Sequence, residues 1–246
     1  KQVLLNSNGA TDQERWEETG GYSPNTMAVI AAALAGVGEK DAATKILETA
    51  LQKTVSYHGP LSNEPYFIRI SRNGTSDNGD MIQIANGGPY VAENRVLDGG
   101  FIEWVRWFPR PEAYFGKLGE TLNDILENTI RLYDDPSNRV AGRVSTSSRQ
   151  GLLLFGRYAF DAYGYGGKAG PWPILTAERA LFAMRENPAT GIKGLREVRT
   201  LWGAGDLCPE QLGYDLRPIA YAATPLVWCH AEMIELANLY NLRTKR

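Results

Sequence analysis

Two stretches of helical periodicity separated by a glycine break narrow the choice of fold most. Residues 26–36 and 39–55 place apolar side chains at every third or fourth position, and Gly36, Val37 and Gly38 separate the two stretches. Apolar residues at this spacing line one face of a helix, and glycine commonly ends a helix. The sequence therefore predicts two antiparallel helices joined by a short turn.

The same pairing of helices continues along the chain. Further helices are expected at residues 98–108 with Asp98 as N-cap, 118–133, 173–187, 195–202 and 224–240. Between them lie long loops at residues 56–89 and 144–170, rich in glycine and aromatic residues, with a short strand expected at 66–70. Six or seven helices joined in this way indicate an all-α fold, an α/α toroid with its site on loops at one end. We expect one domain over residues 1–246.

The charge balance argues against two classes of partner. The chain has 26 Lys and Arg residues against 28 Asp and Glu, for a net charge of -2. Such a balance gives no field that would attract nucleic acid or an anionic membrane. No run of about 18 apolar residues occurs, so we expect no membrane-spanning helix. A neutral ligand fits this composition better.

Possible metal ligands are few. Cys208 and Cys229 lack the paired spacing of a zinc site, and the sequence leaves open whether they form a disulfide. Asp77, Asn78 and Asp80 carry oxygen ligands suited to Ca²⁺, but a turn explains them equally well. We expect no cofactor, with a structural Ca²⁺ as the weaker alternative.

The most acidic loop of the chain precedes the first long helix. Glu14, Glu17 and Glu18 lie there together with Trp16. The plainer interpretation is an acidic lead-in favoured by the helix dipole. The functional interpretation is a sugar site, because carboxylates bind hydroxyl groups and glycoside cleavage needs one carboxyl group kept protonated by its surroundings.

A second candidate carboxylate, Glu210, lies in a loop before the last helix. Most loop glutamates are simply solvated. An inverting glycosidase, however, needs a second carboxylate about 6.5–9.5 Å from the first to activate a water molecule. Two loops far apart in the sequence are able to supply such a pair.

Four stretches in series resemble the glucoamylase and glucodextranase family, glycoside hydrolase family 15. They are QERWEETGGYSPNT, LDGGFIEWVR, GRYAFDAYGYGGKAGPWPILTAERA, and CPEQLGYD followed by ATPLVWCHAEMIEL. Their order and spacing match across nearly the whole chain. The resemblance implies that residues 1–246 are the C-terminal half of a catalytic domain, about half of an (α/α)6 barrel.

The resemblance also implies roles for individual residues. Glu17 matches the general acid and Glu210 the general base of an inverting, exo-acting hydrolase that releases β-glucose from the non-reducing ends of α-glucans or oligosaccharides. The positions implied for sugar binding are Glu14, Trp16, Glu18, Arg157 and Trp172. Glu14 stands where many members have aspartate, and residues 217–223 replace a glycine-rich segment at the pocket rim, which leaves the preferred linkage open. A surface charge is the plainer interpretation of Arg157, and a core aromatic that of Trp172.

The resemblance implies that part of the barrel is absent from this chain. Family members bind the terminal glucose with an Arg-Asp motif from their first half, and no Arg-Asp pair occurs here. We expect the N-terminal half of the barrel, as a separate chain or as a missing N-terminal segment, to cover apolar faces of residues 27–36 and 224–240 that an open half-ring would expose. The alternatives are a trehalase of the same family and a non-catalytic carbohydrate-binding or structural subunit. We expect an extracellular or periplasmic location.

Overall fold

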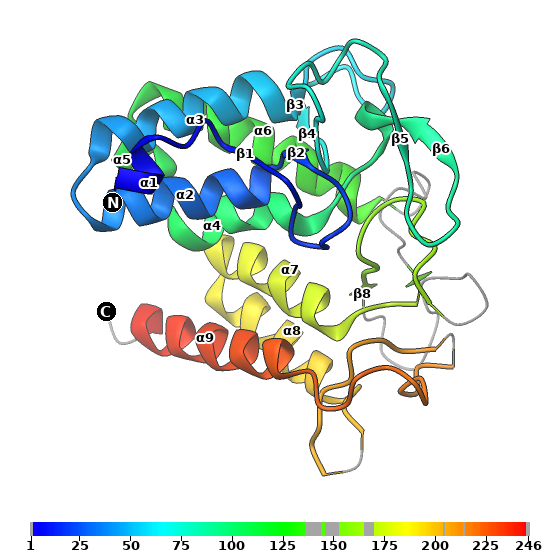
Figure 1. Ribbon diagram of the computed structural model, residues 1–246. Helices are drawn as coiled ribbons and strands as arrows, with labels where there is room; N and C mark the ends of the chain where they lie inside the picture. The colour runs from blue at the N-terminus through cyan, green and yellow to red at the C-terminus, as the bar shows by residue number, and fades with distance from the viewer. Residues whose placement is uncertain are drawn as a thin grey trace.

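The computed structural model describes residues 2–135, 144–145, 153–164, 170–203, 205–213 and 215–244. Its helices run across the view in Figure 1, with the long loops gathered at the right and both ends of the chain at the left. The loops thus lie at one end of the helices, as the sequence predicts.

Helices account for most of the described secondary structure. They are α1 (Gln2–Leu5), α2 (Pro24–Gly36), α3 (Lys40–Thr54), α4 (Ile102–Trp107), α5 (Pro111–Phe115), α6 (Lys117–Asp134), α7 (Pro173–Glu186), α8 (Pro188–Arg199) and α9 (Val227–Thr244), with 3-10 turns η1 (Glu93–Arg95) and η2 (Gly99–Phe101). The predicted helices at 26–36, 39–55, 118–133 and 173–187 agree closely with α2, α3, α6 and α7. Asp98 caps η2 as predicted, because its carboxylate accepts a hydrogen bond from the Gly100 N–H group.

Short antiparallel pairs of strands brace the loops. They are β1 (Ala10–Thr11) with β2 (Gly21–Tyr22), β3 (Val55–Ser56) with β4 (Tyr66–Phe67), β5 (Met81–Gln83) with β6 (Tyr90–Ala92), and β7 (Val144–Ser145) with β8 (Leu153–Leu154). The strand expected over 66–70 pairs as a strand only at its first two residues. Beyond them the chain stays hydrogen-bonded, with Arg69 N–H donating to the Val96 carbonyl at 2.7 Å.

The helices form two groups that meet at α4 and α7. Helix α2 packs against α3 and α4, while α7 packs against α4, α8 and α9. Figure 1 shows the first group above the second. The loops that leave the two groups therefore emerge beside one another.

Helix α8 begins earlier than the sequence predicts. It starts at Pro188, where the Asn187 side chain accepts a hydrogen bond from the Ala189 N–H group, and not at residue 195. Gly191 and Gly194 lower the helical signal of this stretch. A Cβ atom at position 191 would lie 2.0 Å from Cγ of Met184 on α7. Glycine is thus required by the close contact between α7 and α8.

One buried cluster of apolar side chains extends through both groups. Met27 and Leu34 of α2 belong to it, so the exposed apolar face expected over residues 27–36 is wrong: α3 and α4 already cover that face. Helix α9 does expose apolar side chains, with Val227 74% and Ile234 64% exposed. A single domain over residues 1–246 stays a prediction.

The described helices are all too short or too polar to cross a lipid bilayer.

Candidate active site

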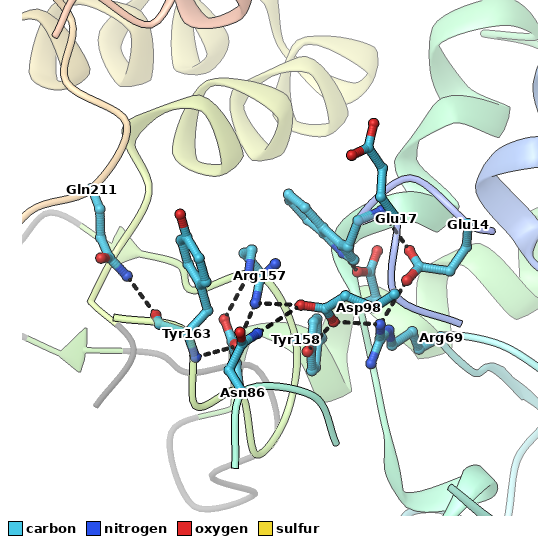
Figure 2. Close-up of polar contacts among 12 residues, drawn as sticks. Glu14, Glu17, Arg69, Asn86, Asp98, Arg157, Tyr158, Tyr163 and Gln211 are labelled. Atoms are coloured by element: carbon cyan, nitrogen blue, oxygen red, sulfur yellow. Dashed lines mark hydrogen bonds and ion pairs between the residues drawn. The ribbon is translucent and has the colours of Figure 1, made fainter. Parts of the chain in front are cut away.

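The acidic loop between β1 and β2 folds into a tight turn around Glu17. The Glu17 N–H group donates to the Glu14 carbonyl at 2.9 Å, and the Glu14 N–H group donates to the Thr19 carbonyl at 3.0 Å. Glu17 has φ 59°, in the left-handed region that non-glycine residues seldom adopt. Its hydrogen bonds to described residues are made by its backbone, and its exposed side chain points away from the Glu14–Arg69 pair in Figure 2.

Glu14 anchors this turn from inside the protein. One carboxylate oxygen lies 2.6 Å from Nη2 of Arg69, and the other accepts the Trp16 N–H group at 2.8 Å. Burial raises the pKa of Glu14, and the Arg69 charge opposes that rise. Because Glu14 is only 4% exposed and both oxygens have protein partners, its contacts are those of a loop anchor. The sugar contact that the resemblance implies for Glu14 stays a prediction.

Glu18 is the hub of the polar network. One oxygen lies 2.9 Å from Nη2 of Arg69 and also accepts the Tyr158 hydroxyl, while the other accepts from Asn86 at 3.0 Å and lies 2.9 Å from Arg157. A carboxylate offers about four acceptor positions, and all are used here. Figure 2 shows the four donor residues, Arg69, Asn86, Arg157 and Tyr158, gathered in one region. A sugar hydroxyl that donates to Glu18 would have to displace one of them.

Arg157 joins this hub to a second carboxylate. Its Nε and Nη2 atoms donate to Asp161 at 2.9 and 2.8 Å, a bidentate geometry. Burial lowers the pKa of Arg157, but Asp161 and Glu18 outweigh it and raise the pKa overall. The guanidinium also lies 4.5 Å from the centre of the Tyr163 ring. Arg157 is thus a buried, fully ionised residue, and the surface-charge interpretation is wrong.

The two predicted tryptophans pack against each other beneath the loop. Trp16 and Trp172 meet edge to face with ring centres 5.6 Å apart, and they are 7% and 5% exposed. The indole N–H group of Trp16 donates to Asp98. Burial raises the pKa of Asp98, whereas Arg15 and this hydrogen bond lower it. Sugar contact by either ring stays a prediction, since little of either ring reaches the surface here.

Glu210 lies on a pocket of about 480 Å³. Its N–H group donates to the Ala223 carbonyl at 2.8 Å, and its carboxylate accepts the Ala223 N–H group at 3.2 Å. Other lining residues are Asn86, Tyr163, Gln211 and Tyr221. Glu17 is not among the described lining residues, so the pairing of Glu17 with Glu210 stays a prediction.

Asn86 links the two candidate loops. It donates to Glu18, next to Glu17, and it also lines the pocket that contains Glu210. Gln211, beside Glu210, donates to the Tyr163 carbonyl at 3.0 Å, and Tyr163 lies against Arg157. The structure therefore brings the surroundings of Glu17 and Glu210 to the same end of the molecule.

A disulfide holds the Glu210 loop to the last helix. Cys208 and Cys229 are bonded, with their Cα atoms 6.3 Å apart. The Cys208 N–H group also donates to Nε2 of His230 at 3.0 Å. The question that the sequence leaves open is thus decided by the fold, which places Cys208 beside α9.

The loop considered for Ca²⁺ uses its oxygens on the protein itself. Asp77 accepts hydrogen bonds from the Ser56 hydroxyl and from the N–H groups of Tyr57 and His58. Asp80 accepts from the Asn73 side chain. Within the described ranges, no three His, Cys, Asp or Glu side chains are grouped as metal ligands.

Four residues of the network are not predicted by any sequence pattern, namely Arg69, Asn86, Tyr158 and Asp161. Each meets its partner only after folding: Arg69 pairs with Glu14 across 55 positions, and Tyr158 reaches Glu18 across 140. Tyr158 and Asp161 lie within the third stretch that resembles the family. The residues next to them in sequence do not indicate that Tyr158 contacts Glu18 or that Asp161 contacts Arg157.

Helix pairs with an acidic, arginine-bearing loop site at one end define part of an (α/α)6 toroid of the glycosidase class. A solved bacterial glucoamylase complexed with acarbose superposes with a TM-score of 0.74 and 27% identity, over 96% of this chain and 36% of that one. The Hormoconis resinae glucoamylase superposes with a TM-score of 0.57 at 16% identity, over 96% of this chain and 44% of that one, which supports the fold alone.

Sequence comparison agrees with the structural match. The glucoamylase of Clostridium sp. (strain G0005) is 34% identical over 251 residues, covering 92% of this chain and 33% of that protein. No family model matches the chain. The chain belongs to the glucoamylase family, glycoside hydrolase family 15, and spans about a third of the length of the curated relative that it matches.

Proposed function

We propose that this chain forms part of an inverting, exo-acting α-glucoside hydrolase that releases β-glucose from non-reducing ends. Glu17 acts as the general acid that protonates the leaving oxygen, and Glu210 acts as the general base that deprotonates the attacking water. Membership of the glucoamylase family supports this reaction class. No metal or cofactor has a part in this mechanism.

The observation that carries the proposal is the position of Asn86. It donates to Glu18, the neighbour of Glu17, and lines the pocket of Glu210. A sugar bound in that pocket would then have one candidate carboxylate on the loop before α2 and the other on the loop before α9. Such an arrangement suits attack by water on the face opposite the leaving group.

The site needs a further part of the barrel. Glu17 is exposed among the described residues, whereas a general acid works best where its surroundings favour protonation. The chain spans about a third of its curated relative, and α9 exposes Val227 and Ile234. We infer that an N-terminal half covers this side of α9, completes the toroid and contributes the cation that binds the terminal glucose. A separate chain is one source of that half.

An extracellular or periplasmic location fits the Cys208–Cys229 disulfide, because disulfides persist in oxidising compartments.

The test is an assay of the completed protein on maltose, isomaltose, dextran and trehalose, with NMR detection of the first anomer released. We expect β-glucose from a maltose- or isomaltose-type substrate. With maltose, isomaltose or dextran, an initial excess of α-glucose over its mutarotation equilibrium would rule out inversion. Hydrolysis of trehalose alone would establish the trehalase alternative, and binding of oligosaccharides without turnover of any substrate would establish the non-catalytic one.

A further inference from the structure

Arg69 occupies an unusual position beneath the acidic loop. It follows β4 and is only 2% exposed, and its guanidinium lies 3.6 Å from the centre of the Tyr158 ring. Such stacking on an aromatic face fixes the plane of the guanidinium. Burial lowers the pKa of Arg69, but Glu14 and its other acidic neighbours outweigh that effect, so the side chain stays charged.

A single nitrogen of Arg69 contacts both carboxylates that flank Glu17. Its Nη2 atom lies 2.6 Å from Glu14 and 2.9 Å from Glu18. The Nε and Nη1 atoms are buried without a hydrogen-bond partner among the described residues. The guanidinium is thus oriented so that one nitrogen bridges the two carboxylates.

The segment between these two anchors contains Glu17 in its left-handed conformation, with φ 59°. A non-glycine residue stays in this region only when the surrounding structure holds it there. The anchors supply that restraint, because Glu14 accepts the Glu17 N–H group through its carbonyl and binds Arg69 through its side chain. On the far side of Glu17, Glu18 is bound by the same nitrogen.

The geometry points to Arg69 as a positioning residue that sets where the Glu17 carboxylate lies. This inference rests on the proposed role of Glu17 as the general acid. Arg69 acts through Glu14 and Glu18 and does not itself contact substrate. Loss of the bridge would let residues 15–17 relax toward an ordinary conformation and move the Glu17 carboxylate away from the leaving oxygen. A displacement of about 1 Å of this kind lowers turnover by about 100-fold.

The test compares Arg69→Lys and Arg69→Met with the control Arg72→Met. Lysine keeps the charge but presents one compact ammonium in place of the planar guanidinium. Arg72 lies three positions along the same segment, and its side chain is exposed. In the isolated chain we measure amide hydrogen exchange at residues 16–19. In the completed enzyme we measure kcat and KM on the best substrate of the panel above.

We expect exchange of the Glu17 amide to rise at least tenfold in Arg69→Met and less in Arg69→Lys, with helices α2 and α3 unchanged. We expect kcat to fall about 100-fold in Arg69→Met and about tenfold in Arg69→Lys, with KM of both variants within about threefold of wild type. Arg72→Met should match wild type in both measurements. A merely structural role would lower the folded fraction and leave the kcat of the folded molecules intact.

Wild-type exchange and wild-type kcat in Arg69→Lys would overturn the inference. Global unfolding of both variants would overturn it as well, because Arg69 would then serve the stability of the whole fold and not this loop. If wild-type protein hydrolyses nothing in the panel, the proposed function fails, while the exchange measurement still decides whether Arg69 holds the loop.

Discussion

Arg106 on α4 donates a hydrogen bond to the buried Glu232 on α9, and this contact joins the two groups of helices. Arg106 also lies 2.8 Å from Glu103, and the neighbouring Glu178 lies 2.7 Å from Arg15. Three buried carboxylates thus share two arginines. Burial is the largest cause that raises the pKa of Glu232, and repulsion from Glu178 is the second. Arg106 lowers this pKa, but the net result is a value of about 8.

This pair predicts a pH-dependent stability. The pKa of Glu232 is higher in the folded state than in the unfolded state. The Glu232 carboxyl group therefore contributes folding stability that is fully present below about pH 4.5 and is lost as the pH rises through about 8. Wild type should therefore lose free energy of unfolding as the pH rises from 5 to 9. Glu232→Gln should lose about 2–4 kcal/mol less over the same range. Urea unfolding of both proteins at the two pH values measures this. The exposed Glu120→Gln serves as control, and a wild-type-like pH dependence in Glu232→Gln would contradict the prediction.

The proposed acid and base predict the kinetics of two variants. Glu17→Gln and Glu210→Gln should each lower kcat of the completed enzyme by about 10²–10⁴ and leave KM within several-fold, because both groups act on the transition state. Initial rates over a range of substrate concentrations separate the two constants. Near-normal turnover in either variant would remove that residue from its assigned role.

The backbone at Glu17 predicts a gain of stability from glycine. Glu17→Gly removes the Cβ that disfavours φ 59°, so the free energy of unfolding should rise by about 0.5–1 kcal/mol even though the carboxylate is lost. Glu48→Gly, in the middle of α3 on its exposed face, should lower it by about 1 kcal/mol. Chemical denaturation reports both changes. Equal losses in the two variants would show that position 17 carries no strain.

The contact between α7 and α8 predicts a steric cost. Gly191→Ala places a Cβ 2.0 Å from Cγ of Met184 and should destabilise the fold by about 1–3 kcal/mol. Gly36→Ala, where nothing lies within 4 Å of the added atom, should be neutral or slightly stabilising. Thermal unfolding of the pair measures the difference. A stable Gly191→Ala would mean that the helices are farther apart than described.

The exposed face of α9 predicts where the proposed N-terminal half binds. Ile234→Asp should weaken association with that half at least tenfold, because a charge would be buried at the interface. Val37→Asp adds the same charge to another exposed apolar position and should have no effect. Analytical ultracentrifugation of the mixed halves gives the two affinities. Unchanged association in Ile234→Asp would place the interface elsewhere.

Local sequence determined the helical architecture, because helix periodicity and capping act between residues a few positions apart. Helices α2, α3, α6 and α7 and the Asp98 cap follow from such patterns. The start of helix α8 was not predicted, because Gly191 weakens the local helical signal. Glycine is needed at this position because α7 lies so close. The short strand at Tyr66–Phe67 likewise ends where its partner strand ends.

The residue types of the acidic loop already indicated a candidate site, with an acidic helix lead-in and a sugar site as the two interpretations. Only the tertiary structure decided what each acid does. Glu14 became an anchor and Glu18 a saturated hub because folding brought Arg69, Asn86, Tyr158 and Arg157 to them. Hydrogen bonds and ion pairs act over a few ångströms in space and leave no periodic trace in the chain, so partners separated by up to 140 positions appear only once the backbone has folded.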